Sequence, residues 1–163
     1  MRRSPSPSFS FLLSRPAHFF ALGCGSGLSP WAPGTMGTLF AWGTFVLGRP
    51  FFTEATFSVF LALAFVFGIN AIHVTGRALR EPDHGSIVWD EIVPFWGVLF
   101  MAPPDLAWQG LAFVGFRFFD IVKPQPARWF DQSMKNGLGV MMDDVVAAGY
   151  TLFSLAMLRW ILA

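Results

Sequence analysis

Apolar residues in this chain gather into a few long segments, and shorter stretches between them carry most of the charge. Residues 56–74 contain no charged side chain, and residues 145–162 contain only Arg159. About 20 apolar residues cross the hydrocarbon layer of a membrane, so the pattern predicts spans at or near these two segments. Three shorter apolar segments complete the pattern: residues 38–47, 92–103 and 106–122.

The five segments predict an all-α protein, a compact polytopic membrane protein of about four to five apolar helices with its functional loops on the cytoplasmic face. Residues 1–22 are expected to form a partly disordered cytoplasmic arm, and residues 23–163 a single helical domain. Because residues 92–103 are few and include Pro94, the third and fourth segments are alternatively a shallow hairpin. A soluble helical bundle with buried short helices also stays open.

The distribution of Lys and Arg tests the orientation, because cytoplasmic loops of membrane proteins carry an excess of both. With the arm inside and five alternating segments, eight of these residues fall inside and two outside. The loops 23–37, 75–91 and 123–144 then lie together on the cytoplasmic side. The inside residues are Arg2, Arg3, Arg15, Arg77, Arg80, Lys123, Arg128 and Lys135, and the outside ones are Arg49 and Arg159.

The amino-acid composition also favours a membrane protein. Hydrophobic residues make up 54% of the chain and charged residues 13%, and the mean hydropathy is +0.53. A soluble domain carries about 25% charged residues. The net charge of +1 provides no basic field for nucleic acid, and the single cysteine, Cys24, excludes a disulfide framework or a multi-cysteine metal site. Any metal would therefore need oxygen or histidine ligands.

Carboxylates concentrate at the edges of the later apolar segments. Asp90-Glu91 stands directly before residues 92–103, and Asp143-Asp144 before residues 145–162. Crowded carboxylates repel each other, and a divalent cation such as Mg²⁺ relieves that repulsion. The alternative is that the second pair only stabilises a helix N-terminus. Two neighbours in the central loop, Asp83 and His84, are further candidates for a ligand or a base.

Three charged residues recur at a spacing of three: Arg117, Asp120 and Lys123. On a helix such residues are neighbours, and an ion pair within an apolar segment is costly enough to suggest a function. Asp120 would then be a further catalytic carboxylate, and the two cations would bind phosphate oxygens. The alternative is an Arg117–Asp120 pair that only neutralises charge.

Glycine, proline and small polar residues dominate the loop 23–37. Such a loop can direct backbone N–H groups at an anion near a helix start, which makes Ser26, Gly27 and Thr35 candidate phosphate contacts. The ending of a Walker A loop, Gly-Lys-Ser/Thr, is missing. A plain turn is the alternative.

Four motifs follow one another along the chain. They are residues 25–39 (GSGLSPWAPGTMGTL), 83–91 (DHGSIVWDE), 116–126 (FRFFDIVKPQP) and 137–149 (GLGVMMDDVVAAG). Together they resemble the phosphatidylglycerophosphatase A family of bacterial membrane enzymes. The chain departs from that family's pattern at two positions: Pro94 stands where the family commonly has Gly, and Asn136 replaces the first residue of a Gly-Gly. Neither departure removes a carboxylate.

The resemblance implies hydrolysis of phosphatidylglycerol phosphate to phosphatidylglycerol and phosphate in phospholipid biosynthesis. It also implies dependence on Mg²⁺ and a site that faces the cytoplasm from the bacterial inner membrane, with a membrane phospholipid as the substrate. The expected metal ligands are Asp90, Glu91, Asp143 and Asp144. Two alternative hypotheses for the function stay open. One is an ion or proton carrier that uses Arg117 and Asp120, and the other is a structural membrane subunit whose carboxylates need not converge.

Overall fold

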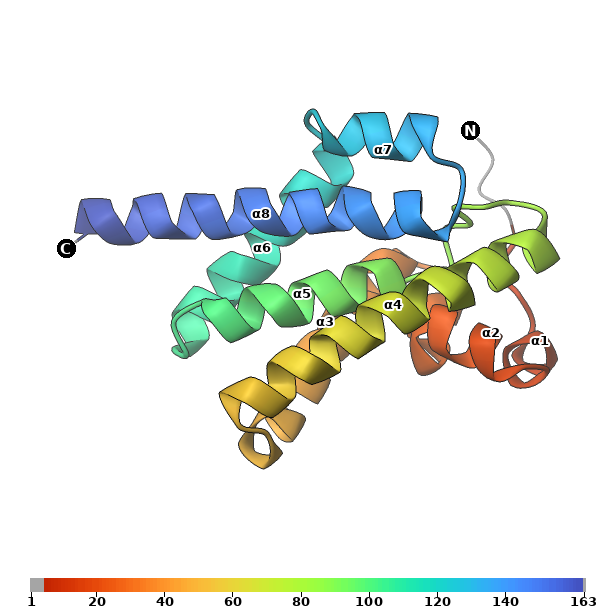
Figure 1. Ribbon diagram of the computed structural model, residues 1–163, viewed down its shortest axis with the longest axis horizontal. Coiled ribbons are helices and arrows are strands. Elements are labelled where there is room, and N and C mark those ends of the chain that lie inside the picture. Colours follow the sequence, from red (N-terminus) through yellow and green to blue (C-terminus); the bar gives the residue numbers. More distant parts are fainter. Residues whose placement is uncertain (1–4, 163) are drawn as a thin grey trace.

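The computed structural model describes residues 5–162, and every regular element within that range is helical. Four of the five longer helices pack directly around the remaining one, α5 (Trp89–Met101), and the short helices α1 (Phe9–Leu13) and α2 (Pro16–Ala21) lie at the end opposite the C-terminus (Figure 1). In chain order the elements are α1 (Phe9–Leu13), α2 (Pro16–Ala21), the 3-10 helix η1 (Gly23–Leu28), α3 (Pro33–Gly48), the 3-10 helix η2 (Arg49–Phe51), α4 (Glu54–Leu79), α5 (Trp89–Met101), α6 (Leu106–Val122), α7 (Ala127–Ser133) and α8 (Gly137–Leu162).

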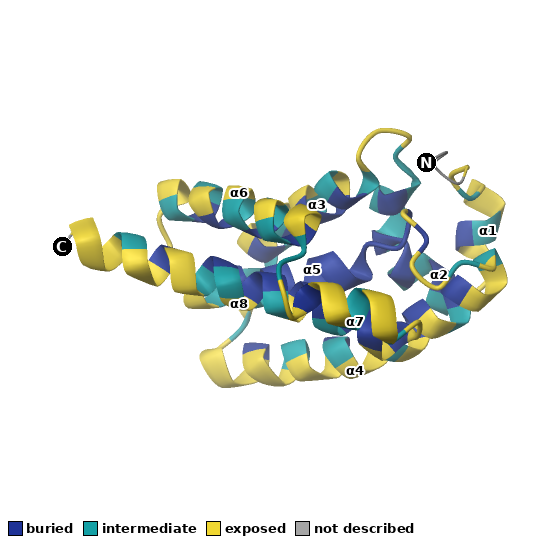
Figure 2. Ribbon diagram, turned by 90° about the horizontal axis from the view of Figure 1, so that it is seen from above, coloured by how far each residue is buried: buried dark blue, intermediate teal, exposed yellow. Residues whose placement is uncertain are grey.

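The central helix, α5, is enclosed by the others. Ten of its 13 residues are buried, including the polar pair Asp90 and Glu91 in its first turn. It packs against α3, α8, α4 and α6, and Figure 2 shows it as the most continuously buried helix. A helix that is apolar on every face must be buried on every face, which explains its central position.

Local chemistry explains where several helices begin and end. Thr53 caps α4 through a reciprocal pair of hydrogen bonds with Thr56, a capping box. Arg80 after α4 and Lys123 after α6 have left-handed backbones, with φ of 59° and 46°. A left-handed residue closes the last helical turn, and Pro124 prevents α6 from continuing. The backbone conformation of Lys123 therefore fixes its position at the end of α6.

Two helices, α4 and α8, are long and apolar enough to cross a membrane. Only 28% and 22% of their most apolar windows are buried, so most of this apolar surface faces outward. On α4 the exposed residues Val59, Leu63 and Val66 lie on one face. A core helix of a soluble bundle would be mostly buried, so this surface indicates association with a membrane.

The other predicted segments are shorter helices. At 1.5 Å per residue, the 13 residues of α5 extend about 20 Å, less than a hydrocarbon core of about 30 Å. The predicted bounds of α6, residues 106–122, agree with the structure. The all-α class is thus confirmed, whereas the number of complete spans, expected to be four to five, stays a prediction.

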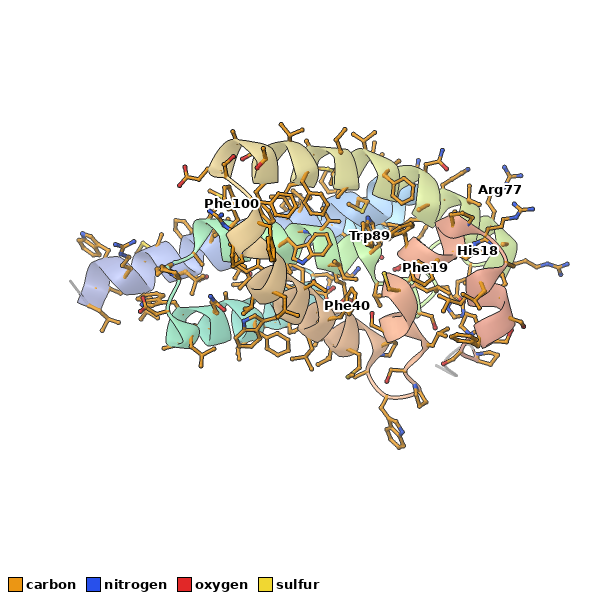
Figure 3. The ribbon with its side chains drawn as sticks, turned by 90° about the horizontal axis from the view of Figure 1, so that it is seen from below. His18, Phe19, Phe40, Arg77, Trp89 and Phe100 are labelled. Carbon is orange, nitrogen blue, oxygen red and sulfur yellow. The ribbon has the colours of Figure 1, made fainter. Side chains whose placement is uncertain are left out.

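The described part of the N-terminal arm is folded. Residues 9–21 form α1 and α2, and α2 packs on α4. Buried Leu12 and His18 anchor the two helices, and Figure 3 labels His18 among the side chains at this end. The His18 ring stacks on Phe11, and its Nδ1 lies 2.9 Å from the Thr75 hydroxyl. The expected disorder is wrong for these residues, because their aromatic and apolar side chains have a surface to pack on. Residues 1–4 lie outside the described range.

The segment predicted as the loop 123–144 is also largely helical. It contains α7, and α8 begins at Gly137, eight residues before the predicted apolar segment. Asp143 and Asp144 therefore lie two turns inside a helix, and the interpretation that they stabilise a helix N-terminus is wrong. Gly137 permits this start, since a Cβ there would lie 2.0 Å from the Ile69 carbonyl oxygen of α4.

Candidate active site

The predicted carboxylates converge at one end of the helical body. Asp90 and Glu91 begin α5, Asp120 lies in the last turn of α6, and Asp143 and Asp144 come from α8. All five are buried, with exposed fractions of 9% or less. Asp144 interacts electrostatically with Asp120, Asp143, Asp90 and Glu91. A purely structural membrane subunit would not require its carboxylates to converge, so this arrangement favours a functional site.

Arg117 joins two of these carboxylates. Its guanidinium forms ion pairs with Glu91 of α5 and, at 2.7 Å, with Asp120 one turn further along α6. The Arg117 and Glu91 side chains are 15% and 12% exposed. The charge-neutralising Arg117–Asp120 pair therefore exists, but it extends to a second helix. The guanidinium of Arg117, predicted to bind phosphate oxygens, is thus bonded to two protein carboxylates.

Lys123 also connects the end of α6 to acidic residues of other helices. Its ammonium forms an ion pair with Asp143 and lies 3.5 Å from an oxygen of Asp131 in α7. Burial disfavours the charge, but Asp143 and Asp144 outweigh burial and raise the pKa of the Lys123 ammonium above its ordinary value. Lys123 therefore stays protonated and holds α6, α7 and α8 together at the site.

Three carboxylate oxygens of the cluster are buried without a hydrogen-bond partner: Oδ1 of Asp90, of Asp143 and of Asp144. Buried polar atoms are normally paired, so these three mark a place where a ligand can bind. Within residues 5–162 no three His, Cys, Asp or Glu side chains form a ready-made metal cage. Mg²⁺ does not require one, because it keeps several waters and takes only one or two carboxylates plus phosphate oxygens. The donor set fits that ion.

A cavity of about 600 Å³ opens beside the cluster. Glu91 and Arg117 form part of its wall, whereas the deeper Asp90, Asp143 and Asp144 do not line it. The cavity is large enough for a phosphorylated head group. Its other polar lining residues include Ser29, Thr35, Glu81, His84 and Ser86.

His84 and Asp83, the two further candidates, differ in position. His84 is 5% exposed and borders the cavity, whereas Asp83 is exposed. The backbone N–H of Ser86 donates to His84 Nδ1 at 3.1 Å. Since Nδ1 accepts, a neutral His84 ring carries its proton on Nε2 and can donate from there.

The three candidate contacts in the glycine-rich stretch also differ. Thr35, in the first turn of α3, lines the cavity. Ser26 and Gly27 do not: the Ser26 hydroxyl donates to the Gly23 carbonyl at 2.8 Å, and the Gly27 N–H donates to Leu22. A Cβ on Gly27 would lie 2.1 Å from the Ser86 carbonyl oxygen, so this glycine allows η1 to pack on the central loop.

Sequence reasoning missed two residues of the site, Gly34 and Thr38. The buried Thr38 hydroxyl lies 3.0 Å from Glu91 Oε2 and 2.9 Å from the Gly34 carbonyl oxygen. A Cβ on Gly34 would lie 2.1 Å from Glu91 Oε1, so only glycine lets this carboxylate approach α3. The signal was their spacing of four within an apolar helix, which puts both on one face.

Comparison with known proteins agrees with these motifs. A family model described as phosphatidylglycerophosphatase A matches residues 19–159. The phosphatidylglycerophosphatase A of Escherichia coli (strain K12) is 44% identical over 137 residues, covering 83% of this chain and 78% of that protein. That of Haemophilus influenzae is 44% identical over 147 residues, covering 89% and 90%.

A third relative carries a different name. A protein of Bacteroides thetaiotaomicron, provisionally named a phosphatidylinositol-3-phosphatase, is 39% identical over 147 residues, covering 86% of this chain and 91% of its own. No solved structure matches the chain at a comparable level of significance. The family model spans most of the chain and includes every carboxylate of the cluster, so the chain belongs to the phosphatidylglycerophosphatase A family.

Proposed function

We propose that the chain is a lipid phosphatase that hydrolyses phosphatidylglycerol phosphate to phosphatidylglycerol and phosphate in phospholipid biosynthesis. The observation that carries the proposal is the buried cluster of five carboxylates with Arg117 and Lys123, next to a cavity of about 600 Å³. The names of the two relatives that are 44% identical support this substrate.

The site would face the cytoplasm from a bacterial inner membrane. In Figure 1, α4 and α6 run opposite to α3, α5 and α8, as a chain that crosses repeatedly requires. The connections before α5 and before α8 are then on the same side as α2 (Figure 1). The elements on that side carry six of the eight described Lys and Arg residues other than Arg117: Arg15, Arg77, Arg80, Lys123, Arg128 and Lys135. The positive-inside rule assigns such a side to the cytoplasm.

Asp90, Asp143 and Asp144 would hold Mg²⁺ through their unpartnered oxygens. When bound, this ion would supply electrophilic polarisation of the phosphoryl group and an activated water. Glu91 is less available as a ligand, because Arg117 and Thr38 already contact its carboxylate. We therefore assign Glu91 to positioning Arg117.

Arg117 would bind the substrate phosphate by exchange. It lines the cavity while paired with Glu91, and a dianionic phosphate in the cavity competes for the same guanidinium. The planar guanidinium can bind two phosphate oxygens at once, which orients the group toward the deeper carboxylates. Thr35 and the Nε2–H of His84 would add donors from the cavity wall.

The rival function, an ion or proton carrier, receives less support. Arg117 and Asp120 pair with each other within the last two turns of α6, and Arg117 also pairs with Glu91 of α5. A pathway across a membrane needs sites at several depths along the helices. Both residues instead belong to one compact cluster.

The test is phosphate release from phosphatidylglycerol phosphate by purified protein in mixed micelles, with Mg²⁺ or with excess chelator. We expect activity with Mg²⁺, loss in chelator, and a loss of at least about a hundredfold for Asp90→Asn. Asp105→Asn is the matched control, since Asp105 is exposed at the start of α6 and outside the cluster. Full activity of Asp90→Asn, or full activity in chelator, would refute the proposed site.

A parallel assay with phosphatidylinositol 3-phosphate addresses the head group. The 39% identical relative is named for that lipid, whereas the two relatives at 44% are named for phosphatidylglycerol phosphate. We expect the glycerol head group to be preferred. A higher kcat/KM for the inositol lipid would overturn the assignment of substrate while leaving the phosphatase site in place.

A further inference from the structure

We propose that a groove between α4, α5 and α8 binds an acyl chain of the substrate and so holds the lipid with its head group at the carboxylate cluster. This inference rests on the proposed lipid phosphatase function. The groove has a volume of about 420 Å³, and every residue that lines it is apolar or glycine. A pocket with no polar lining side chain suits hydrocarbon and offers a head group nothing to bind.

The groove begins where the cluster ends. Pro94, Gly97 and Met101 line it and continue the face of α5 on which Asp90 lies, since they follow that residue by four, seven and eleven positions. On α8 its lining begins at Val145, the residue directly after Asp144. A lipid whose phosphate reaches the unpartnered Asp90 and Asp144 oxygens would therefore have hydrocarbon at the mouth of the groove.

The length of the groove suits a lipid chain. From Val93 to Met101 the helix rises about 12 Å at 1.5 Å per residue, most of one half of a hydrocarbon core about 30 Å thick. Leu61 and Phe65 of α4 form the opposite wall, and Met101 and Gly149 are exposed at its edge. The groove is thus open sideways, as entry of a chain from the bilayer requires.

Two glycines keep the groove open. A Cβ added to Gly97 of α5 or to Gly149 of α8 would meet no atom within 4 Å, so a larger side chain at either position would project into free space. Leucine is a better helix former than glycine, and these substitutions should leave folding intact. Gly43 of α3 has the same open surroundings but lines no groove, which makes Gly43→Leu the matched control.

The experiment compares Gly97→Leu, Gly149→Leu and Gly43→Leu on long-chain phosphatidylglycerol phosphate and on a short-chain analogue in solution. We expect kcat/KM for the long-chain lipid to fall about tenfold in the two groove variants, as for the lost burial of one or two methylene groups. The short-chain analogue and the Gly43→Leu control should be unaffected. Equal losses on both substrates, or no loss in the groove variants, would overturn the proposal.

A binding measurement tests the acyl-chain groove independently of the proposed phosphatase activity. Native mass spectrometry of the detergent-solubilised protein should find phosphatidylglycerol retained by the wild type and by Gly43→Leu, and lost from Gly97→Leu. Retention without phosphate release by the wild type would support the groove and refute the phosphatase. Conversion of a dimer to a monomer by Gly97→Leu would overturn the proposal, because the groove would then be an interface between two copies.

Discussion

Lys123→Met tests whether the cation at the end of α6 holds the site together. The substitution keeps much of the aliphatic length but leaves Asp143, whose side chain is 3% exposed, without its ion-pair partner. Removal of one member of a buried pair costs about 3–5 kcal/mol, because the other charge stays buried alone. We expect the lower end, about 3 kcal/mol, because the Lys123 side chain is itself 27% exposed.

The assay is the free energy of unfolding in mixed micelles titrated with sodium dodecyl sulfate, in the presence of chelator so that metal binding does not contribute. A double-mutant cycle with Asp143→Asn should recover about 2 kcal/mol, since the second change removes the stranded charge. Lys135→Met is the control: Lys135 is exposed, its ammonium bonds the Asp131 carbonyl oxygen, and its loss should cost less than about 0.5 kcal/mol. A loss below about 1 kcal/mol for Lys123→Met, or a double variant no more stable than the single one, would refute this reasoning.

Two further predictions concern the packing around the site. Gly34→Ala places a Cβ 2.1 Å from Glu91 Oε1, so it should displace that carboxylate and lower phosphatase activity at least about tenfold. In the control Gly43→Ala the new Cβ meets no atom within 4 Å, and activity should not fall. Equal activities of the two variants would contradict the close approach of Glu91 to Gly34. Burial, reinforced by the charge of Arg15, lowers the pKa of His18 from 6.5, so the unfolded chain binds the proton more tightly than the folded one. Stability contributed by neutral His18 is therefore complete above pH 6.5 and is lost as the pH falls below that value. The difference in unfolding free energy between wild type and His18→Gln should shrink between about pH 7.5 and pH 5.5, and a difference independent of pH would exclude this role.

The long apolar segments were predictable because their length and hydropathy are local properties. The bounds of α6 follow from Asp105 before the segment and Pro124 after it, both visible as letters in the sequence. The start of α8 was not predictable in this way. Residues 137–144 contain glycine and two carboxylates, and they become helical because the chain there packs on α4, α5 and α7. Tertiary packing overrides such weak local preferences.

The sequence motifs likewise predicted which residues form the site, but not which ion pairs they make. The two acidic pairs are visible directly in the sequence, and the four motifs indicated the family before any geometry was known. Sequence reasoning offered Arg117 and Lys123 as phosphate-binding cations, with an Arg117–Asp120 pair as the alternative. In the folded chain that pair is present, but Arg117 also bonds Glu91 of α5, and Lys123 bonds Asp143 of α8. Partners on separate helices depend on how those helices cross, which no spacing along one segment specifies.

By itself, the sequence determined that this protein is helical, apolar enough for a membrane, and equipped with carboxylates in ordered motifs of one phosphatase family. These properties depend on residue type and on separation along the chain. Only the tertiary structure decided that the carboxylates are buried together, that Gly34 and Thr38 contact Glu91, and that an apolar groove opens between α4, α5 and α8. The reason is physical: burial, ion pairing and free volume arise between helices, where surfaces distant in sequence meet.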